Sequence, residues 1–82
     1  MSNKAKSKTL IDVGFKNTIA ADKIVAIVSA DAAPIRRLKS IAKKENRLID
    51  ATNGRRTNSV IITTSNHVVL SSARPETITQ RF

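Results

Sequence analysis

The sequence predicts a small α+β domain with mostly antiparallel strands, one principal helix and a short C-terminal helix. Short β-branched runs separated by turn residues indicate the strands, and a single segment shows helical periodicity. A chain of 82 residues makes one domain, which buries only about 60 to 65% of the surface that its unfolded form exposes. We therefore expect the chain to gain stability by associating with copies of itself.

Two strands are expected in the first third of the domain. The segment "TLIDVGF" forms a short strand that ends at Gly14, and Lys16 with Asn17 forms the following turn. The run "KIVAIVS", from Lys23 to Ser29, is rich in β-branched residues and has the length of a strand. Because this run is apolar almost throughout, we expect both of its faces to be buried.

The principal helix is expected from about Pro34 to Glu45. Proline suits the first turn of a helix, and Asp31 places a negative charge near the positive end of the helix dipole. One face is apolar and the other basic: the former consists of Ile35, Leu38, Ile41 and Ala42, and the latter of Arg36, Arg37, Lys39, Lys43 and Lys44. This spacing is typical of an amphipathic helix.

A hairpin is predicted around Asn53 and Gly54, which separate "RLIDAT" from "TNSVIITT". Both residues tolerate the positive φ angles of a type I′ turn, and this pair is the strongest short-range hairpin signal. We expect the two runs to pair with each other, so that Arg55 and Arg56 begin the returning strand. Gly54 is then a structural turn residue.

The end of the chain predicts a second hairpin and a short helix. Ser65 and Asn66 separate "VIITT" from "HVVLSS", and "RPETITQRF" begins a terminal helix at Pro75 and Glu76. The opening "MSNKAKSK" contains almost no apolar residue, so we expect residues 1–8 to form a disordered basic tail and residues 9–82 a single domain.

The charge balance predicts an anionic partner. Fifteen Lys and Arg residues outnumber six Asp and Glu residues, which gives a formal net charge of +9. A membrane-surface protein would expose large apolar and aromatic side chains, whereas Phe15 and Phe82 are the only aromatic residues here. A small basic chain of this composition fits a nucleic-acid-binding protein best.

Several other classes of protein are disfavoured. With no cysteine and only His67, the chain has no zinc-site pattern, and its apolar runs are far shorter than a membrane span of roughly 20 residues. Asp12, Asp50 and His67 have no spacing that predicts a shared catalytic site, and no glycine-rich phosphate loop is present. We expect neither an enzyme nor a cofactor, metal, membrane or small-molecule substrate, and a cytoplasmic location without a signal peptide.

The adjacent Arg55 and Arg56 are the main binding candidates. Both guanidinium groups can reach one anion from the mouth of a turn, and their planar forks suit phosphate oxygens and guanine edges. Arg36 and Arg37 are secondary candidates, because they lie in a helical first turn that disfavours positive charge. A solvated hairpin tip and a solvated helix face explain the same residues without any partner.

Duplex DNA is favoured over single-stranded RNA as the partner. Recognition of single strands relies on aromatic platforms worth about 1 to 3 kcal/mol per base, and the chain has no Trp or Tyr. Recognition of duplex RNA by its shape stays open. A helix-turn-helix reader is disfavoured because only one helix of adequate length is predicted.

The sequence is similar to the RemA family of extracellular matrix regulators, small bacterial DNA-binding transcriptional activators. The resemblance extends from about Thr9 to Phe82. It rests on the stretches "IDVGFKN", "KIVAIVS", "APIRRL", "LIDATNGRRT", "VIITTSNHVVLSS" and "RPETITQRF". It implies a β-rich fold with one principal helix, assembled into a closed ring of about seven or eight protomers with DNA bound by basic residues around it.

The resemblance also implies roles for individual residues. Arg55 and Arg56 match paired arginines implicated in DNA binding, and Lys23 matches an arginine implicated in the same role. Pro34 matches a proline at the helix start that matters for integrity. Lys16, where the family usually has glycine, is a further secondary DNA-binding candidate.

Other positions depart from the family pattern. Ala30 stands where proline is common, Asn46 where glycine usually ends the helix, and Asn58 where a third arginine often follows. The replacement of arginine by Lys23 loses the bidentate fork, and Asn58 removes a cation, so DNA affinity or the target can differ.

The sequence therefore predicts a homo-oligomeric DNA-binding transcriptional regulator, of extracellular matrix or biofilm-type genes. The first alternative is a nucleoid-type architectural protein that binds DNA with little sequence preference. An RNA-binding module is the second alternative.

Overall fold

The computed structural model describes residues 9–82, so the predicted basic tail lies outside the described residues. The elements, in chain order, are β1 (Leu10–Asp12), β2 (Thr18–Ala20), a 3-10 helix (Ala21–Lys23), β3 (Ile24–Ser29), α2 (Ala33–Lys44), β4 (Leu48–Asp50), β5 (Ser59–Thr63), β6 (Val68–Ser71) and α3 (Pro75–Thr79). The predicted α+β class is confirmed, with one main helix and a short C-terminal helix. The β2 strand and the 3-10 helix were not predicted.

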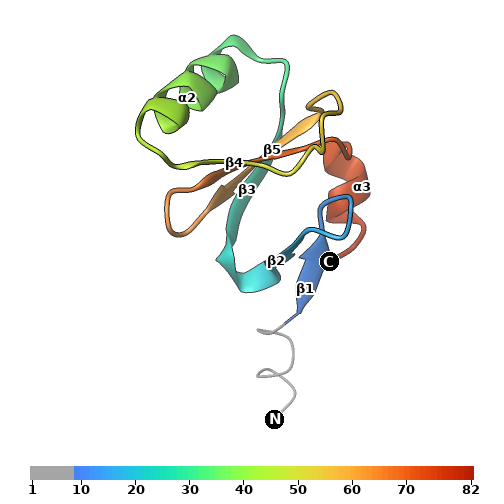
Figure 1. Ribbon diagram of the computed structural model, residues 1–82. Coiled ribbons are helices and arrows are strands. Elements are labelled where there is room, and N and C mark those ends of the chain that lie inside the picture. Colours follow the sequence, from blue (N-terminus) through green and yellow to red (C-terminus); the bar gives the residue numbers. More distant parts are fainter. Residues whose placement is uncertain (1–8) are drawn as a thin grey trace.

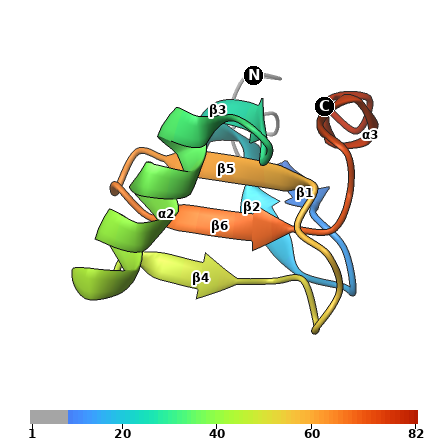
Figure 2. The same ribbon diagram turned by 90° about the horizontal axis from the view of Figure 1, so that it is seen from above.

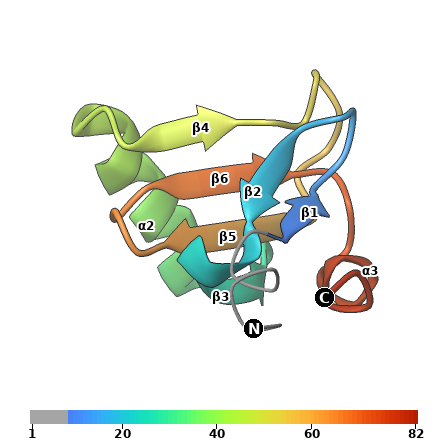
Figure 3. The same cartoon turned by 90° about the horizontal axis from the view of Figure 1, so that it is seen from below.

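The fold has three layers around a four-stranded sheet. The sheet order is β3-β5-β6-β4, and helix α2 covers one face (Figures 1 and 2). The hairpin of β1 and β2, together with α3, lies on the other face (Figure 3). The β3–β5 and β5–β6 pairs are antiparallel, and β4 pairs with β6 in parallel.

The predicted pairing of the two runs around Asn53 and Gly54 is wrong. The turn itself forms, because Asn53 and Gly54 have φ angles of 55° and 82° and Arg55 N donates a hydrogen bond to Thr52 O at 3.0 Å. The strands on either side are separated by β6, so they belong to different parts of the sheet. All four residues of β6 are buried, which favours a central position, whereas β4 is short and half exposed and lies at the edge.

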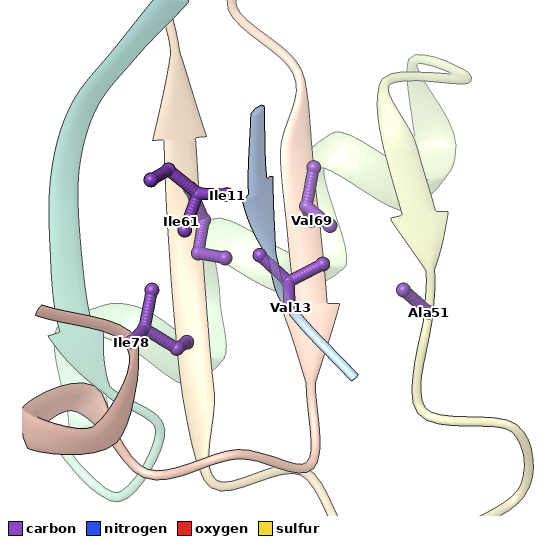
Figure 4. Packing of buried hydrophobic residues seen from close by; sticks show 6 residues of the cluster. All are labelled: Ile11, Val13, Ala51, Ile61, Val69 and Ile78. Carbon is purple, nitrogen blue, oxygen red and sulfur yellow. The ribbon is translucent and has the colours of Figure 1, made fainter. Parts of the chain in front are cut away.

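Successive side chains of the central strands point to opposite faces of the sheet and contribute to two cores. Val60, Val68 and Leu70 face the helix layer with Ala42, while Ile61 and Val69 face the other layer. Figure 4 shows the second cluster, which is completed by Ile11, Val13, Ala51 and Ile78. The second predicted hairpin, β5–β6, is confirmed and carries this alternation on both of its strands.

The expected burial of both faces of the run from Lys23 to Ser29 is wrong. In the single chain β3 is an edge strand, and the side chain of Val25 is 63% exposed. The apolar stripe of the helix is also narrower than predicted, since Ile41 is 49% exposed. These apolar surfaces lack a covering element within residues 9–82.

Both predicted helices are confirmed. Helix α2 begins one residue before Pro34, which occupies its first turn, and ends one residue before Glu45. Asn46 follows with a φ of 59°, a left-handed conformation that asparagine tolerates where helices often end at glycine. Asn46 therefore ends the helix in the conformation that glycine usually supplies.

Candidate nucleic-acid interface

Four connections meet at one end of the central sheet. Strands β3, β6 and β4 all end there and β5 begins there, because β5 is antiparallel to both β3 and β6, and β4 is parallel to β6. The β1–β2 turn and the start of α3 lie at the same end (Figures 2 and 3). The loop between β4 and β5, residues 51–58, is the longest of these connections and carries the arginine pair.

This β4–β5 loop is held at its start by Asp50. One carboxylate oxygen, Oδ1, accepts hydrogen bonds from Thr52 Oγ1 at 2.6 Å and Thr52 N at 2.9 Å. These two bonds hold the pKa of Asp50 below its ordinary value of 3.8, and the bond from the Thr52 hydroxyl has the larger effect. Thr52 itself is buried, so the first residues of the loop cannot move independently of the domain.

The end of the loop is held by Asn58. Its backbone N donates to Ser71 O at 2.8 Å, and its side-chain amide donates to Ser72 O at 2.8 Å. Its carbonyl accepts a hydrogen bond from Ala30 N at 3.3 Å. Asn58 is therefore an anchor that ties three connections together.

Between these anchors, Arg55 and Arg56 are exposed and point to different neighbours. The guanidinium carbon of Arg55 lies 5.5 Å from the centroid of the Phe15 ring, a cation–π arrangement. Arg56 Nη2 lies 4.0 Å from Asp31 Oδ1, and these two side chains are 80% and 78% exposed. Because water screens such a contact strongly, Arg56 can exchange Asp31 for another anion.

The structure brings some of the other predicted cations to this end. Lys16 is exposed in the β1–β2 turn, directly after Phe15, with a φ of 64° that glycine would adopt with less strain. Arg36 and Arg37 are exposed in the first turn of α2, a few residues after Asp31. Lys16 therefore follows the residue that contacts Arg55, and Arg36 and Arg37 follow the residue that contacts Arg56.

Lys23 does not join this group within one chain. Its carbonyl accepts a hydrogen bond from Thr64 N at 2.8 Å, which places it beside the turn between β5 and β6. That turn lies at the opposite end of the sheet from the arginine pair (Figure 2). A shared role in DNA binding for Lys23, Arg55 and Arg56 stays a prediction.

A polar cleft adjoins the arginine pair. It has a volume of about 330 Å³ and lies between the β3–α2 loop, the β4–β5 loop and the start of α3. Its lining includes Arg56, Asp31 and Asn58, and also Arg74 and Glu76. Sequence reasoning did not select Arg74, because a single cation before a proline carries no signal of which loop it will face.

The acid and base candidates are engaged in their own turns. Asp12 Oδ1 accepts a hydrogen bond from Gly14 N at 2.6 Å, Asp50 is bonded to Thr52, and His67 Nδ1 lies 2.7 Å from Ser65 Oγ. Across residues 9–82, no three His, Cys, Asp or Glu side chains are grouped so that they could hold a metal ion. No helix in the same range is long and apolar enough to cross a membrane.

We predict that the hold of Asp50 on the loop weakens in acid. Because its pKa is lower in the folded chain, its ionised form stabilises the fold above about pH 3.8, and this contribution is lost as the pH falls through the lowered value. The backbone amide proton of Thr52, followed by NMR, should report this titration with a midpoint below 3.8. In the Asp50→Asn control the titration should vanish; a midpoint at or above 3.8 in the native chain would contradict the assignment.

Comparison with known proteins shows which family the chain resembles. The family described as RemA-like, extracellular matrix regulatory protein A-like, matches residues 10–82. A relative from Fervidobacterium nodosum is 58% identical over 73 residues, covering 89% of this chain and 78% of the relative. Relatives from Kosmotoga olearia and Thermotoga maritima are 56% and 55% identical over 73 residues, covering 89% of this chain and 74% and 79% of those proteins.

All three relatives are named as candidate regulatory proteins. The names and the family description indicate a regulatory role rather than an enzymatic one. The match begins in β1 and ends at the last residue of the chain, so it includes the β4–β5 loop and the cleft beside it. By the extent of the family match and by these identities, the chain belongs to the RemA-like family of regulatory proteins.

Proposed function

We propose that the protein regulates transcription by binding duplex DNA as a homo-oligomer, with Arg55 and Arg56 as the principal contacts. The observation that carries this proposal is the exposed arginine pair on a loop anchored at both ends. Asp50 and Asn58 hold the backbone on either side, so little conformational freedom remains to be lost when the loop binds. The guanidinium groups themselves stay in solvent, where phosphates can reach them.

The charge of the described chain supports a phosphate partner. Lys4, Lys6 and Lys8 lie in the first eight residues, so twelve of the fifteen Lys and Arg residues and all six acids belong to residues 9–82. Twelve cations against six acids leave an excess of six positive charges in residues 9–82, although Asp31 and Glu76 lie beside the arginines of this end of the sheet. Neutralising phosphates with such cations releases counterions and supplies much of the affinity for DNA.

Two apolar edges of the sheet support self-assembly. At the β3 edge, Val25 and Phe82 are 63% and 61% exposed and line a shallow groove of about 300 Å³. At the opposite edge, Ile49 of β4 is 48% exposed. When these two different edges of neighbouring protomers meet head to tail, they form a heterologous interface, which gives a ring when the rotation closes. We propose such a ring, with the seven or eight protomers that the family resemblance implies.

The central prediction concerns the arginine pair. Replacing both residues, Arg55→Ala with Arg56→Ala, should lower the affinity for a duplex by about tenfold or more, roughly 1.4 kcal/mol, because a ring multiplies each protomer's contact. Stability should change by no more than about 0.5 kcal/mol per residue, since both side chains are exposed. Fluorescence anisotropy measures the affinity, and circular dichroism and light scattering measure the helix content and mass.

The matched control removes the same charge from the far end of helix α2. Lys43→Ala with Lys44→Ala takes away two exposed cations in the last turn, close to the end of the sheet opposite the arginine pair. We expect a smaller loss of affinity from this control. An equal loss would mean that net charge and not the loop accounts for binding, and a change of mass in the arginine variant would make those residues structural.

Self-assembly is tested at the β3 edge. Val25→Asp places a charge in the apolar groove and should reduce the particle mass, whereas Ser40→Asp adds the same charge on the exposed side of α2 and should not. Light scattering of the native protein at micromolar concentration should give several times 8.9 kDa. A monomeric native protein would rule out the ring.

The regulatory role is tested by where the protein binds in the cell. A genome-wide immunoprecipitation profile should show a few sharp peaks at promoters, including promoters of extracellular matrix genes, as the family description suggests. Uniform coverage would instead identify an architectural protein of the chromosome. Peaks at unrelated promoters would keep the regulatory role and contradict only the target class.

A further inference from the structure

We propose that the polar cleft beside the arginine pair is a phosphate-binding site, in which Arg74 acts together with Arg56 on a phosphate of the DNA backbone. This inference rests on the proposed DNA-binding function and extends its surface to a residue outside the arginine pair. The cleft is open, has a volume of about 330 Å³ and carries two arginines from different connections. Paired guanidinium groups on one cleft suit the several acceptor oxygens of a phosphate.

The backbone segments that carry the two arginines are bonded to each other. The side-chain amide of Asn58, two residues after Arg56, donates to Ser72 O, two residues before Arg74. The hydroxyl of Ser59, the next residue in the chain, donates to Ala73 O. Ser59 is fully buried and Asn58 is partly buried, so these bonds join the two backbones that carry the arginines. The cleft is therefore formed before any ligand arrives.

Arg74 has no structural task that would explain its long charged side chain. Its backbone carbonyl accepts hydrogen bonds from Thr77 N at 3.0 Å and Ile78 N at 3.1 Å at the start of α3. Within residues 9–82 its guanidinium group makes neither a hydrogen bond nor an ion pair. Any residue with a carbonyl would start the helix, so the cation is available to a partner.

The acids of the cleft act as competitors of the phosphate. Asp31 lies 4.0 Å from Arg56, and Glu76 lines the same space, so the unliganded cleft contains two cations and two anions. A phosphate that enters must take the place of Asp31 beside Arg56. A substitution that removes the charge of Asp31 leaves both arginines in place. It should therefore raise the affinity for DNA.

The test compares single variants in one binding assay. Arg74→Ala should weaken binding of a duplex by about three- to tenfold, and the slope of log K against log salt should become shallower by about 0.9 for each phosphate that is no longer neutralised. Lys44→Ala removes the same charge from the last turn of α2 and should weaken binding by less than about twofold. Arg74→Lys should recover most of the affinity, whereas thermal stability and particle mass should be unchanged in all three. Equal losses for Arg74→Ala and Lys44→Ala would overturn the proposal.

Further binding experiments identify the source of the phosphate and separate this inference from the proposed function. Asp31→Asn should strengthen DNA binding by about two- to fivefold, and Glu45→Gln, which removes the same charge from the pair with Arg47, by less. If Arg74→Ala abolishes the binding of inorganic phosphate, followed by calorimetry, but leaves the affinity for DNA unchanged, the cleft binds a free anion and DNA is not its ligand. If Arg55→Ala keeps its affinity while Arg56→Ala and Arg74→Ala both lose it, the arginine pair fails as the principal contact and the cleft stands.

Discussion

The arrangement of the loops at this end of the sheet, including the β4–β5 loop, depends on the position of β6 between β4 and β5. Because β4 pairs with β6 in parallel, the chain must cross the end of β6 before it can start β5. The crossing segment is the β4–β5 loop, and it passes over Ser71 and Ser72, whose carbonyls accept the hydrogen bonds of Asn58. A simple hairpin would have placed Arg55 and Arg56 within a strand, on opposite faces of the sheet.

The same crossing brings the start of α3 beside the loop. Buried Ser59 and Ser71 satisfy backbone groups of this connection: the former donates to Ala73 O, and the latter accepts from Ala73 N and donates to Val13 O. These two hydroxyls thus join the four-stranded sheet to the β1–β2 layer and to the last helix. The cleft with Arg56 and Arg74 on it is a consequence of polar contacts inside the domain. In the proposed ring, the two apolar edges of the sheet face neighbouring protomers, so this end of every sheet stays open to solvent and to DNA.

The local chemistry of the sequence determined much of this protein. Helix α2 follows from Pro34 and the apolar spacing, the β5–β6 hairpin from alternating apolar residues around Ser65 and Asn66, and the positive φ angles from Asn53 and Gly54. Turn type, helix period and net charge depend on neighbouring residues or on composition, so they can be read from the chain. The exposure of the arginine pair could also be predicted from the sequence.

Only the tertiary structure decided which strands became neighbours. The sequence favoured a hairpin at Asn53, but the fully buried β6 occupies the centre of the sheet, because its apolar residues on both faces gain more from burial than those of β4. The anchoring role of Asn58 and the placement of Arg56 and Arg74 on one cleft follow from that order, and the antiparallel pairing of β3 with β5 puts Lys23 at the opposite end. Contacts between residues far apart in the chain have no local signal, since they depend on the summed burial of whole elements.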